Sequence, residues 1–224
     1  MMLAPLMLAC CAPSTAEEAT DDGAKVADQA GIPVSKTRYF PPASEQPRIV
    51  CDYGRGSKSQ PIIDEFENRW FSQQLTAANE PSLYLATQRL GRDHPFILRF
   101  TWLRSFDSPV FIRVETTGDE KYRLTAKELS GAGGYDPGTT NRSVERELRR
   151  DEVERLRQIL ARTLLPSLKP KDCAIGCDGS NWIFEIVDKQ GYHVLTRWSP
   201  EYGPVREAGI FLMSLSGWTF TEVY

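Results

Sequence analysis

One stretch of the chain decides the fold: CDGSNWIFEIVDKQGYHVLTRWSP, which runs from Cys177 to Pro200. Its two halves, residues 181–187 and 192–198, are rich in β-branched and aromatic side chains, which favour β-strands. The residues between them, 188–191, are typical of a tight turn. The stretch therefore predicts an antiparallel β-hairpin.

The length of the turn decides which side chains share a face of this hairpin. With a two-residue or a four-residue loop, one face carries Val187–Tyr192, Glu185–Val194 and Ile183–Thr196, and the other carries Ile186–His193, Phe184–Leu195 and Trp182–Arg197. A three-residue loop would exchange the faces. Trp182 and Arg197 are candidates for a cation–π contact. Glu185, among apolar neighbours, lies either at a sheet edge or in an unusual environment, and buried carboxylates are usually paired.

The composition indicates one ordinary globular domain. The 224 residues are 41% hydrophobic and 10% aromatic, which is enough for a hydrophobic core. The formal net charge is −3, and the sequence contains no basic stripe of the kind that binds phosphate backbones. We therefore expect no nucleic-acid partner.

The first residues indicate export. Residues 1–11 are uncharged and apolar, and they end in Cys10 and Cys11. The run is about half of the ~20 apolar residues that a membrane span needs, and it is typical of the end of a secretory signal. It resembles a bacterial lipoprotein signal, in which an aliphatic residue and small residues precede the cysteine that is lipidated; residues 7–10 and 8–11 both fit. The same resemblance, with no Asp after the cysteine pair, implies the periplasmic face of the outer membrane rather than the inner membrane.

The remaining chain divides into a tether and a domain. Residues 12–47 are rich in Ala, Glu, Asp, Thr, Ser and Pro, a composition that buries too little apolar surface to fold alone. We expect a flexible acidic tether over residues 12–47 and a single α+β domain over residues 48–224.

Three cysteines lie beyond the anchor, at Cys51, Cys173 and Cys177. Exported proteins meet an oxidising compartment, so one disulfide is expected. Cys173 and Cys177 are near enough along the chain to close a small loop and are the preferred pair. Cys51 with either of them is the alternative and would tie the start of the domain to the hairpin. The Cys-x3-Cys spacing without a nearby histidine is a poor zinc pattern, and we expect neither a metal nor a cofactor.

The order of elements predicts an α+β fold: an antiparallel sheet, made of a meander and the C-terminal hairpin, with helices packed on one face. Helical spacing covers residues 64–78, 151–164 and 205–215, and β-rich runs cover residues 82–89, 95–104, 110–117, 121–129 and 142–148. At the first helix, the apolar residues that lie on or near one face are Ile63, Phe66, Trp70, Phe71 and Leu75.

Two local patterns add detail. Asp151 is expected to cap the helix of residues 151–164, with Glu154 in the position of a capping box. The glycine-rich segment Ser130–Thr140 lacks the Gly-Lys-Ser/Thr of a phosphate loop. It predicts a plain flexible loop and leaves open a place for it at the edge of a ligand site.

Several segments together resemble a group of uncharacterised proteobacterial lipoproteins and exported proteins. They are Arg69–Ser72 with Glu80–Leu83, Phe100–Phe106, Leu129–Tyr135, Asp178–Glu185 and Tyr192–Pro200, the last two giving the pattern DGSxW…YHxxxRWSP. The resemblance covers most of residues 64–218. It implies an exported location but no reaction and no catalytic residues.

Two functional hypotheses from different classes follow. The first is a membrane-tethered, non-enzymatic interaction module of the periplasm, such as an inhibitor, an immunity protein or an envelope scaffold with a protein partner. Its candidate binding surface consists of Asp178, Trp182, Glu185, His193, Arg197 and Trp198. The alternative is a periplasmic hydrolase of cell-wall or glycan substrates that works through Glu185 and Asp178, with Trp182 and Trp198 as stacking surfaces. Neither histidine, His94 nor His193, belongs to a known catalytic motif.

The anchor gives a direct prediction. An alkyne analogue of palmitate fed to expressing cells should label the full-length protein, and the label should disappear when both Cys10 and Cys11 are changed to Ser. The labelled protein should fractionate with the outer membrane. Unlabelled full-length protein in the cytosolic fraction would contradict the expected export and lipidation.

Overall fold

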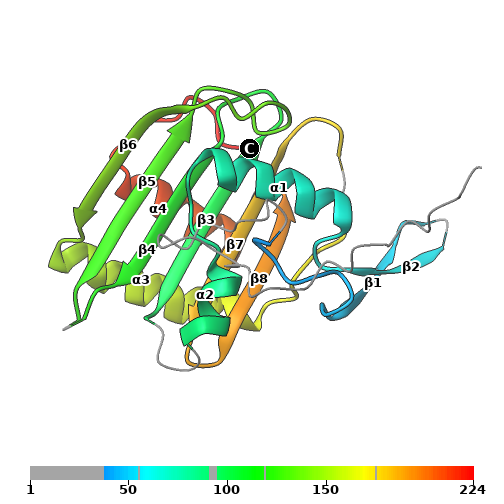
Figure 1. The fold of residues 1–224 in the computed structure, drawn as a ribbon, viewed down its shortest axis with the longest axis horizontal. Helices are drawn as coiled ribbons and strands as arrows, with labels where there is room; N and C mark the ends of the chain where they lie inside the picture. Colours follow the sequence, from blue (N-terminus) through cyan, green and yellow to red (C-terminus); the bar gives the residue numbers. More distant parts are fainter. Residues whose placement is uncertain (1–37, 55, 91–94, 119, 175) are drawn as a thin grey trace, which may run out of the picture.

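The structure is a computed structural model that describes residues 38–224 apart from residues 55, 91–94, 119 and 175 (Figure 1). The expected signal, Cys10, Cys11 and residues 12–37 of the expected tether therefore lie outside the described residues, as does His94. In the part of the chain that is described, no helix is long and apolar enough to cross a membrane.

The described elements, in chain order, are β1 (Arg48–Asp52), β2 (Ser57–Pro61), α1 (Glu65–Ala77), α2 (Leu83–Leu90), β3 (Ile97–Arg104), β4 (Val110–Thr116), β5 (Tyr122–Leu129), β6 (Thr140–Glu147), α3 (Arg150–Thr163), the short 3-10 helix η1 (Leu165–Ser167), β7 (Ser180–Asp188), β8 (Gly191–Trp198) and α4 (Pro204–Leu215). Strands β3 to β8 form one antiparallel sheet in the order β6-β5-β4-β3-β7-β8. Strands β1 and β2 form a separate hairpin beside it (Figure 1). The predicted α+β class with an antiparallel sheet is confirmed.

The hairpin of β7 and β8 has the predicted register. Glu185 stands opposite Val194 and Trp182 opposite Arg197, and the two-residue loop is closed by the pair Asp188 and Gly191. The expected stacking of Arg197 on Trp182 does not occur, because Arg197 donates hydrogen bonds to main-chain oxygens of Thr196 and Lys169. It is Arg206 of α4 that lies over the Trp182 ring, 5.8 Å from its centroid.

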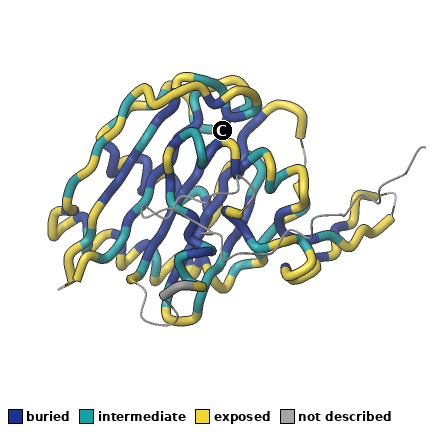
Figure 2. Tube along the Cα trace, in the orientation of Figure 1, coloured by how far each residue is buried: buried dark blue, intermediate teal, exposed yellow. Residues whose placement is uncertain are grey.

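Helices cover both faces of the sheet, whereas the sequence predicted helices on one face. In Figure 1, α1 lies in front of the sheet and α3 and α4 lie behind it. Along β3 every residue is buried, and along β7 all but the last (Figure 2). Phe100 and Trp102 pack towards α3 and α4, while Leu103 and Ile183 pack towards α1. Central strands that are buried on both faces lose the polar and apolar alternation on which the one-face prediction relied.

The side of the sheet covered by α3 and α4 holds a large aromatic core. Trp102 and Trp182 are fully buried with their ring centroids 6.0 Å apart. Their indole nitrogens both donate to the main-chain oxygen of Tyr224, at 3.1 and 2.9 Å. The segment that follows α4 therefore supplies the hydrogen-bond acceptor that these two buried donors require.

Helix α2, Leu83–Leu90, lies where a strand was predicted over residues 82–89. Ser82 caps its N-terminal end, because the Ser82 hydroxyl oxygen accepts the N–H of Leu85 at 3.1 Å, as N-terminal capping residues do.

At the start of α3 the cap differs from the predicted one. Glu152, rather than Glu154, accepts the main-chain N–H of Arg149, at 2.8 Å. The helix begins one residue before the expected Asp151.

The last ten residues of the expected tether belong to the domain. Tyr39 and Phe40 are buried against α1 in the second core cluster. Gln46 is buried too, and its amide exchanges two hydrogen bonds with the main chain of Ile63, at 2.8 and 3.0 Å. Arg38 also belongs to the folded part, because its main-chain oxygen accepts a hydrogen bond from the hydroxyl of Ser82.

The disulfide joins Cys51 to Cys173, and the preferred pairing of Cys173 with Cys177 is wrong. The Cα atoms of Cys51 and Cys173 are 5.5 Å apart, although the two residues are 122 positions apart in the sequence. The two segments meet because Lys171 donates to the main-chain oxygen of Ile62 and to the carboxylate of Glu67. Cys177 is exposed and has no disulfide with any described residue.

A long closed loop makes this disulfide a strong contributor to stability. Changing both Cys51 and Cys173 to Ser should lower the free energy of unfolding by about 2–5 kcal/mol, measured by urea denaturation under non-reducing conditions. Changing Cys177 to Ser should leave the midpoint unchanged. A proteolytic fragment that links Cys173 to Cys177 in the unreduced protein would contradict this pairing.

Candidate functional site

A large surface groove lies beside α1, where loops from three other parts of the chain meet it. Its volume is about 860 Å³. Its lining residues are Phe66, Arg69, Trp70, Gln73, Ser105, Phe106, Gly134, Tyr135, Asp136, Gly176, Cys177 and Trp198. Five of these twelve residues are aromatic, against 10% of the whole chain, so the groove concentrates flat apolar surface.

Helix α1 supplies one wall of the groove with a single stripe of side chains. The stripe consists of Phe66, Arg69, Trp70 and Gln73, which share a face because of their three- and four-residue spacing. The opposite face of the helix buries Phe71 and Leu75 against the sheet. Phe66 and Trp70, predicted to share one face with Phe71 and Leu75, thus line the groove. Phe66 is exposed, and Trp70 is half-buried because it also packs against the core.

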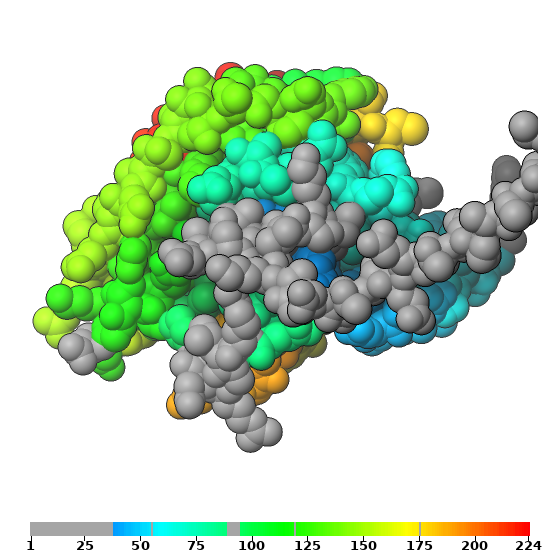
Figure 3. All heavy atoms as spheres, in the orientation of Figure 1, coloured from blue at the N-terminus to red at the C-terminus, as the bar shows by residue number. Residues whose placement is uncertain are grey.

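The glycine-rich loop between β5 and β6 forms the neighbouring wall and is held in place by close contacts. A Cβ atom on Gly133 would lie 2.6 Å from the main-chain nitrogen of Arg104, so only glycine allows this approach. The indole N–H of Trp70 donates to the oxygen of Gly133 at 2.6 Å, and Gln74 donates to the same oxygen at 3.1 Å. Figure 3 shows the loop directly against α1. The loop expected to be flexible is therefore fixed to the helix.

Two exposed aromatic rings stand at the rim of the groove. Phe106 and Tyr135 are 62% and 64% exposed, and their rings are stacked with centroids 6.0 Å apart. They come from the β3–β4 turn and from the glycine-rich loop. Large exposed rings next to one another are a common mark of an interaction site.

Trp198, at the end of β8, forms part of the far wall. The main chain passes close to its indole at two glycines: a Cβ on Gly176 would lie 2.2 Å from Nε1, and a Cβ on Gly179 would lie 2.8 Å from Cζ2. These glycines let the chain lie flat against the ring. Trp198 is thereby fixed in place while it still lines the groove.

The groove also contains polar groups that are available to a ligand. Arg69 and Gln73 are exposed, and their side chains make no hydrogen bond or ion pair with any described residue. One carboxylate oxygen of Asp136 accepts the N–H of Gly138 at 2.8 Å, and the other oxygen has no hydrogen bond with the part of the chain that is described. The site thus combines aromatic faces with a guanidinium, an amide and a carboxylate.

The residues predicted as one binding surface are not brought together. Trp182 and Glu185 are fully buried on opposite faces of β7. His193 lies 3.3 Å from Asp188 and lines a separate hollow. Arg197 lines another hollow, beside α4. Asp178 is exposed, and of the six residues only Trp198 lines the groove.

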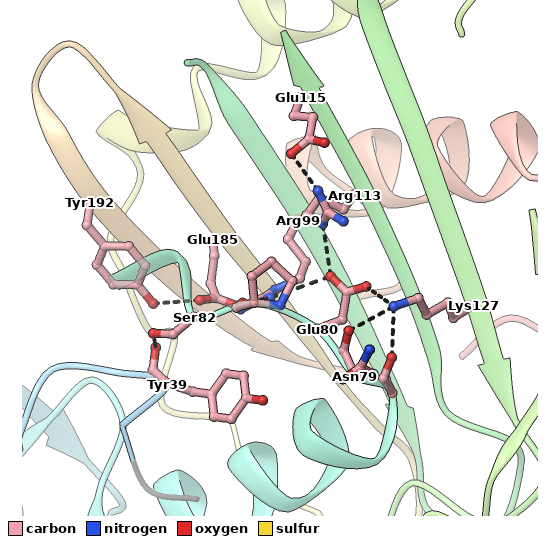
Figure 4. A network of polar contacts seen from close by, with 12 residues as sticks. Tyr39, Asn79, Glu80, Ser82, Arg99, Arg113, Glu115, Lys127, Glu185 and Tyr192 are labelled. Carbon is pink, nitrogen blue, oxygen red and sulfur yellow. Dashed lines mark hydrogen bonds and ion pairs between the residues drawn. The ribbon is translucent and has the colours of Figure 1, made fainter. Parts of the chain in front are cut away.

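Glu185 belongs to a buried charge network on the α1 side of the sheet (Figure 4). One carboxylate oxygen accepts hydrogen bonds from Arg99 Nε and Nη2, at 2.8 and 2.5 Å, and the other accepts the hydroxyl of Tyr192 at 2.9 Å. Arg99 also donates to the main-chain oxygen of Pro81. The carboxylate is thus paired, as expected, in a structural contact away from solvent.

Glu80, in the turn between α1 and α2, is the second centre of this network. Its carboxylate lies 3.0 Å from Arg113 Nε, 2.9 Å from Lys127 Nζ and 3.7 Å from Arg99 Nη1. Lys127 also donates to the main-chain oxygens of Ala78 and Asn79, at the C-terminal end of α1. With Glu115 paired to Arg113, three carboxylates face three cations.

The two buried glutamates have shifted pKa values of opposite sign. Burial raises the pKa of Glu185 and outweighs the attraction of Arg99. Burial acts in the same direction on Glu80, but Arg113, Arg99 and Lys127 together hold the pKa of Glu80 below its ordinary value. Burial and the neighbouring Glu185 raise the pKa of Tyr192 well above its ordinary value. Of this network only Tyr192 lines a described hollow, and neither Glu80 nor Glu185 lines one. We assign the network to stability.

Comparison with known proteins adds no assignment: no protein-family model matches the sequence, and no curated protein is significantly similar to it. The resemblance to exported proteobacterial proteins stays a prediction. Among the described residues, no group of three His, Cys, Asp or Glu side chains is placed to hold a metal ion.

The network predicts an acid-dependent loss of stability. Changing Glu80 to Gln should cost about 3–5 kcal/mol at pH 7, because it leaves buried cations without their partner. The pKa of Glu80 is lowered in the folded state, so its contribution is complete above pH 4.5 and is lost as the pH falls through its folded pKa. The difference in unfolding free energy between the wild type and Glu80→Gln should therefore shrink below pH 4.5.

The matched control is Glu145→Gln, since the Glu145 side chain is 63% exposed and pairs with Arg123 at the sheet edge. It should cost under about 1 kcal/mol at any pH. Urea titrations across pH 3–8 measure both variants. Equal costs for the two variants at pH 7 would show that the buried network is not a source of stability.

Proposed function

We propose that the protein is a lipid-anchored binding module of the bacterial envelope, non-enzymatic, which holds its ligand in the groove beside α1. The observation that carries the proposal is the groove itself. Five aromatic side chains from separate parts of the chain meet there beside Arg69 and Gln73 of α1, which have no partner among the described residues. Concave sites with many aromatic rings and a few convergent polar groups are typical ligand sites.

The hydrolase alternative receives less support. Glu185 is fully buried, and both of its carboxylate oxygens are engaged by Arg99 and Tyr192. A general acid or a nucleophile must reach its substrate. Asp178 is exposed but has no second carboxylate of the proposed pair beside it, because Glu185 points into the domain interior. Binding is the function that remains for the aromatic surface.

The proposed tether suits a binding role at a membrane. Residues 12–37 number 26 between the lipidation site and the first described residue. A flexible chain of that length spans on the order of 30 Å. A domain so attached could sample the periplasm near the outer membrane, which raises its effective concentration at any envelope ligand.

The groove can be tested without disturbing the core. Full-length protein in detergent should co-sediment with detergent-washed envelope material, and the double variant Phe106→Ser, Tyr135→Ser should co-sediment at least fivefold less. Both rings are largely exposed, so the variant should keep its unfolding midpoint. Binding should weaken because the two rings supply contact area for the ligand.

Tyr202 provides the matched control, because it is 86% exposed and lies in a different hollow from the groove. Tyr202→Ser should co-sediment as the wild type does. Equal retention of the wild type, the double variant and Tyr202→Ser would contradict the assignment of binding to the groove. If the wild type is not retained at all, the proposed binding function is wrong.

A further inference from the structure

We infer that the ligand of the groove is an oligosaccharide of pyranose rings that carry hydroxyl and amide groups. The inference rests on the proposed function, because it names the chemical class that the same site would take. A pyranose ring presents a flat face of C–H groups and a rim of hydroxyls. A complementary site therefore needs aromatic faces interleaved with planar polar groups.

The stripe on α1 has that alternation. Phe66 and Trp70 supply aromatic faces one helical turn apart, and Arg69 and Gln73 supply a guanidinium and an amide between and beyond them. Both polar groups are planar and can make paired hydrogen bonds to two adjacent hydroxyls. Their freedom from any described partner means that a ligand would not have to displace an existing contact.

The other walls continue the pattern. Trp198 lines the groove from the end of β8, and the stacked pair Phe106 and Tyr135 stands at its rim. Asp136 adds an acceptor for hydroxyl or amide hydrogens. A groove of about 860 Å³ lined on several sides by rings has room for more than one sugar.

Other ligand classes fit the groove less well. An acyl chain would bury Arg69, Gln73 and Asp136 without hydrogen-bond partners, at a cost for each. An extended proline-rich peptide also docks in aromatic grooves, but it gains from indole N–H groups that donate to its carbonyls. Of the two indoles that line the groove, that of Trp70 already donates its N–H to the oxygen of Gly133 at 2.6 Å, which leaves only that of Trp198 for such a peptide.

The charges in the groove point to a ligand without strong net charge. Arg69 and Asp136 are the ionised groups of the lining and have opposite signs. A phosphate-rich ligand would meet one cation and one anion, so it would gain little net attraction. A neutral sugar with N-acetyl groups can use both as hydrogen-bond partners.

The probe is N-acetylchitotetraose, titrated into the full-length protein in detergent and followed by calorimetry and tryptophan fluorescence. We expect saturable binding with a change in emission, because two tryptophans line the groove. Arg69→Ala and Gln73→Ala should each weaken binding about threefold to tenfold, the usual effect of one lost hydrogen-bonding group. Purified peptidoglycan should retain the wild type and lose these variants.

The control variants are Gln190→Ala and Arg155→Ala, exposed residues of the same types on the β7–β8 loop and on α3. They should bind as the wild type does. Binding that is unaffected by Arg69→Ala and Gln73→Ala would overturn the assignment of the sugar to the groove. Equal or tighter binding of a decaproline peptide would overturn the sugar class in favour of a peptide.

The failure of this inference can be told from the failure of the proposed function. If the tetrasaccharide and peptidoglycan do not bind while envelope material still retains the protein through Phe106 and Tyr135, the ligand is of another class and the binding module stands. If envelope material retains nothing through these rings, both proposals fail together.

Discussion

The buried pair of Arg99 and Glu185 is the contact on which the rest of the structure depends. It lies on adjacent central strands, where Arg99 stands directly opposite Glu185 in the register of β3 and β7. Arg99 also binds the oxygen of Pro81, and Lys127 binds the oxygens of Ala78 and Asn79. The charges of the sheet thus hold the turn after α1. Because that turn fixes the helix, it also fixes the stripe that α1 presents to the groove.

This arrangement has an energetic cost that a purely apolar interface would avoid. Several charges lose their hydration, and each is tolerated only while its partners remain in place. The opposite shifts of Glu80 and Glu185 express the balance: three cations favour the charged form of Glu80, while burial dominates for Glu185. The apolar side chains of α1 pack on the sheet, and the directional hydrogen bonds add a fixed position for the turn that follows the helix. A binding site with a fixed geometry gains from both.

The sequence was sufficient where short-range patterns decide the structure. The register of β7 and β8 followed from strand alternation and a two-residue turn, and the α+β class followed from the order of elements. It was insufficient where distant segments meet. Nothing local brings Cys51 to Cys173. Nothing local shows that Phe71 is fully buried whereas its neighbour Trp70, which packs against it, also lines the groove. Of the groove aromatics, Trp198 alone was predicted to be a binding residue, because the others lie on segments that only tertiary packing assembles.

The groove contains two kinds of side chain: aromatic rings held by their neighbours and exposed polar groups that are free to move. Trp70 is held by its hydrogen bond to Gly133, and the backbone at Gly176 and Gly179 packs against the indole of Trp198. A ligand therefore meets these rings already in place and does not have to order them. Arg69 and Gln73 are exposed and unpartnered among the described residues, so each loses about 0.5–1.5 kcal/mol of side-chain freedom on binding. Affinity would then come mainly from the fixed rings. Selectivity would come from Arg69 and Gln73, because only a ligand that forms hydrogen bonds with both side chains offsets the entropy that they lose.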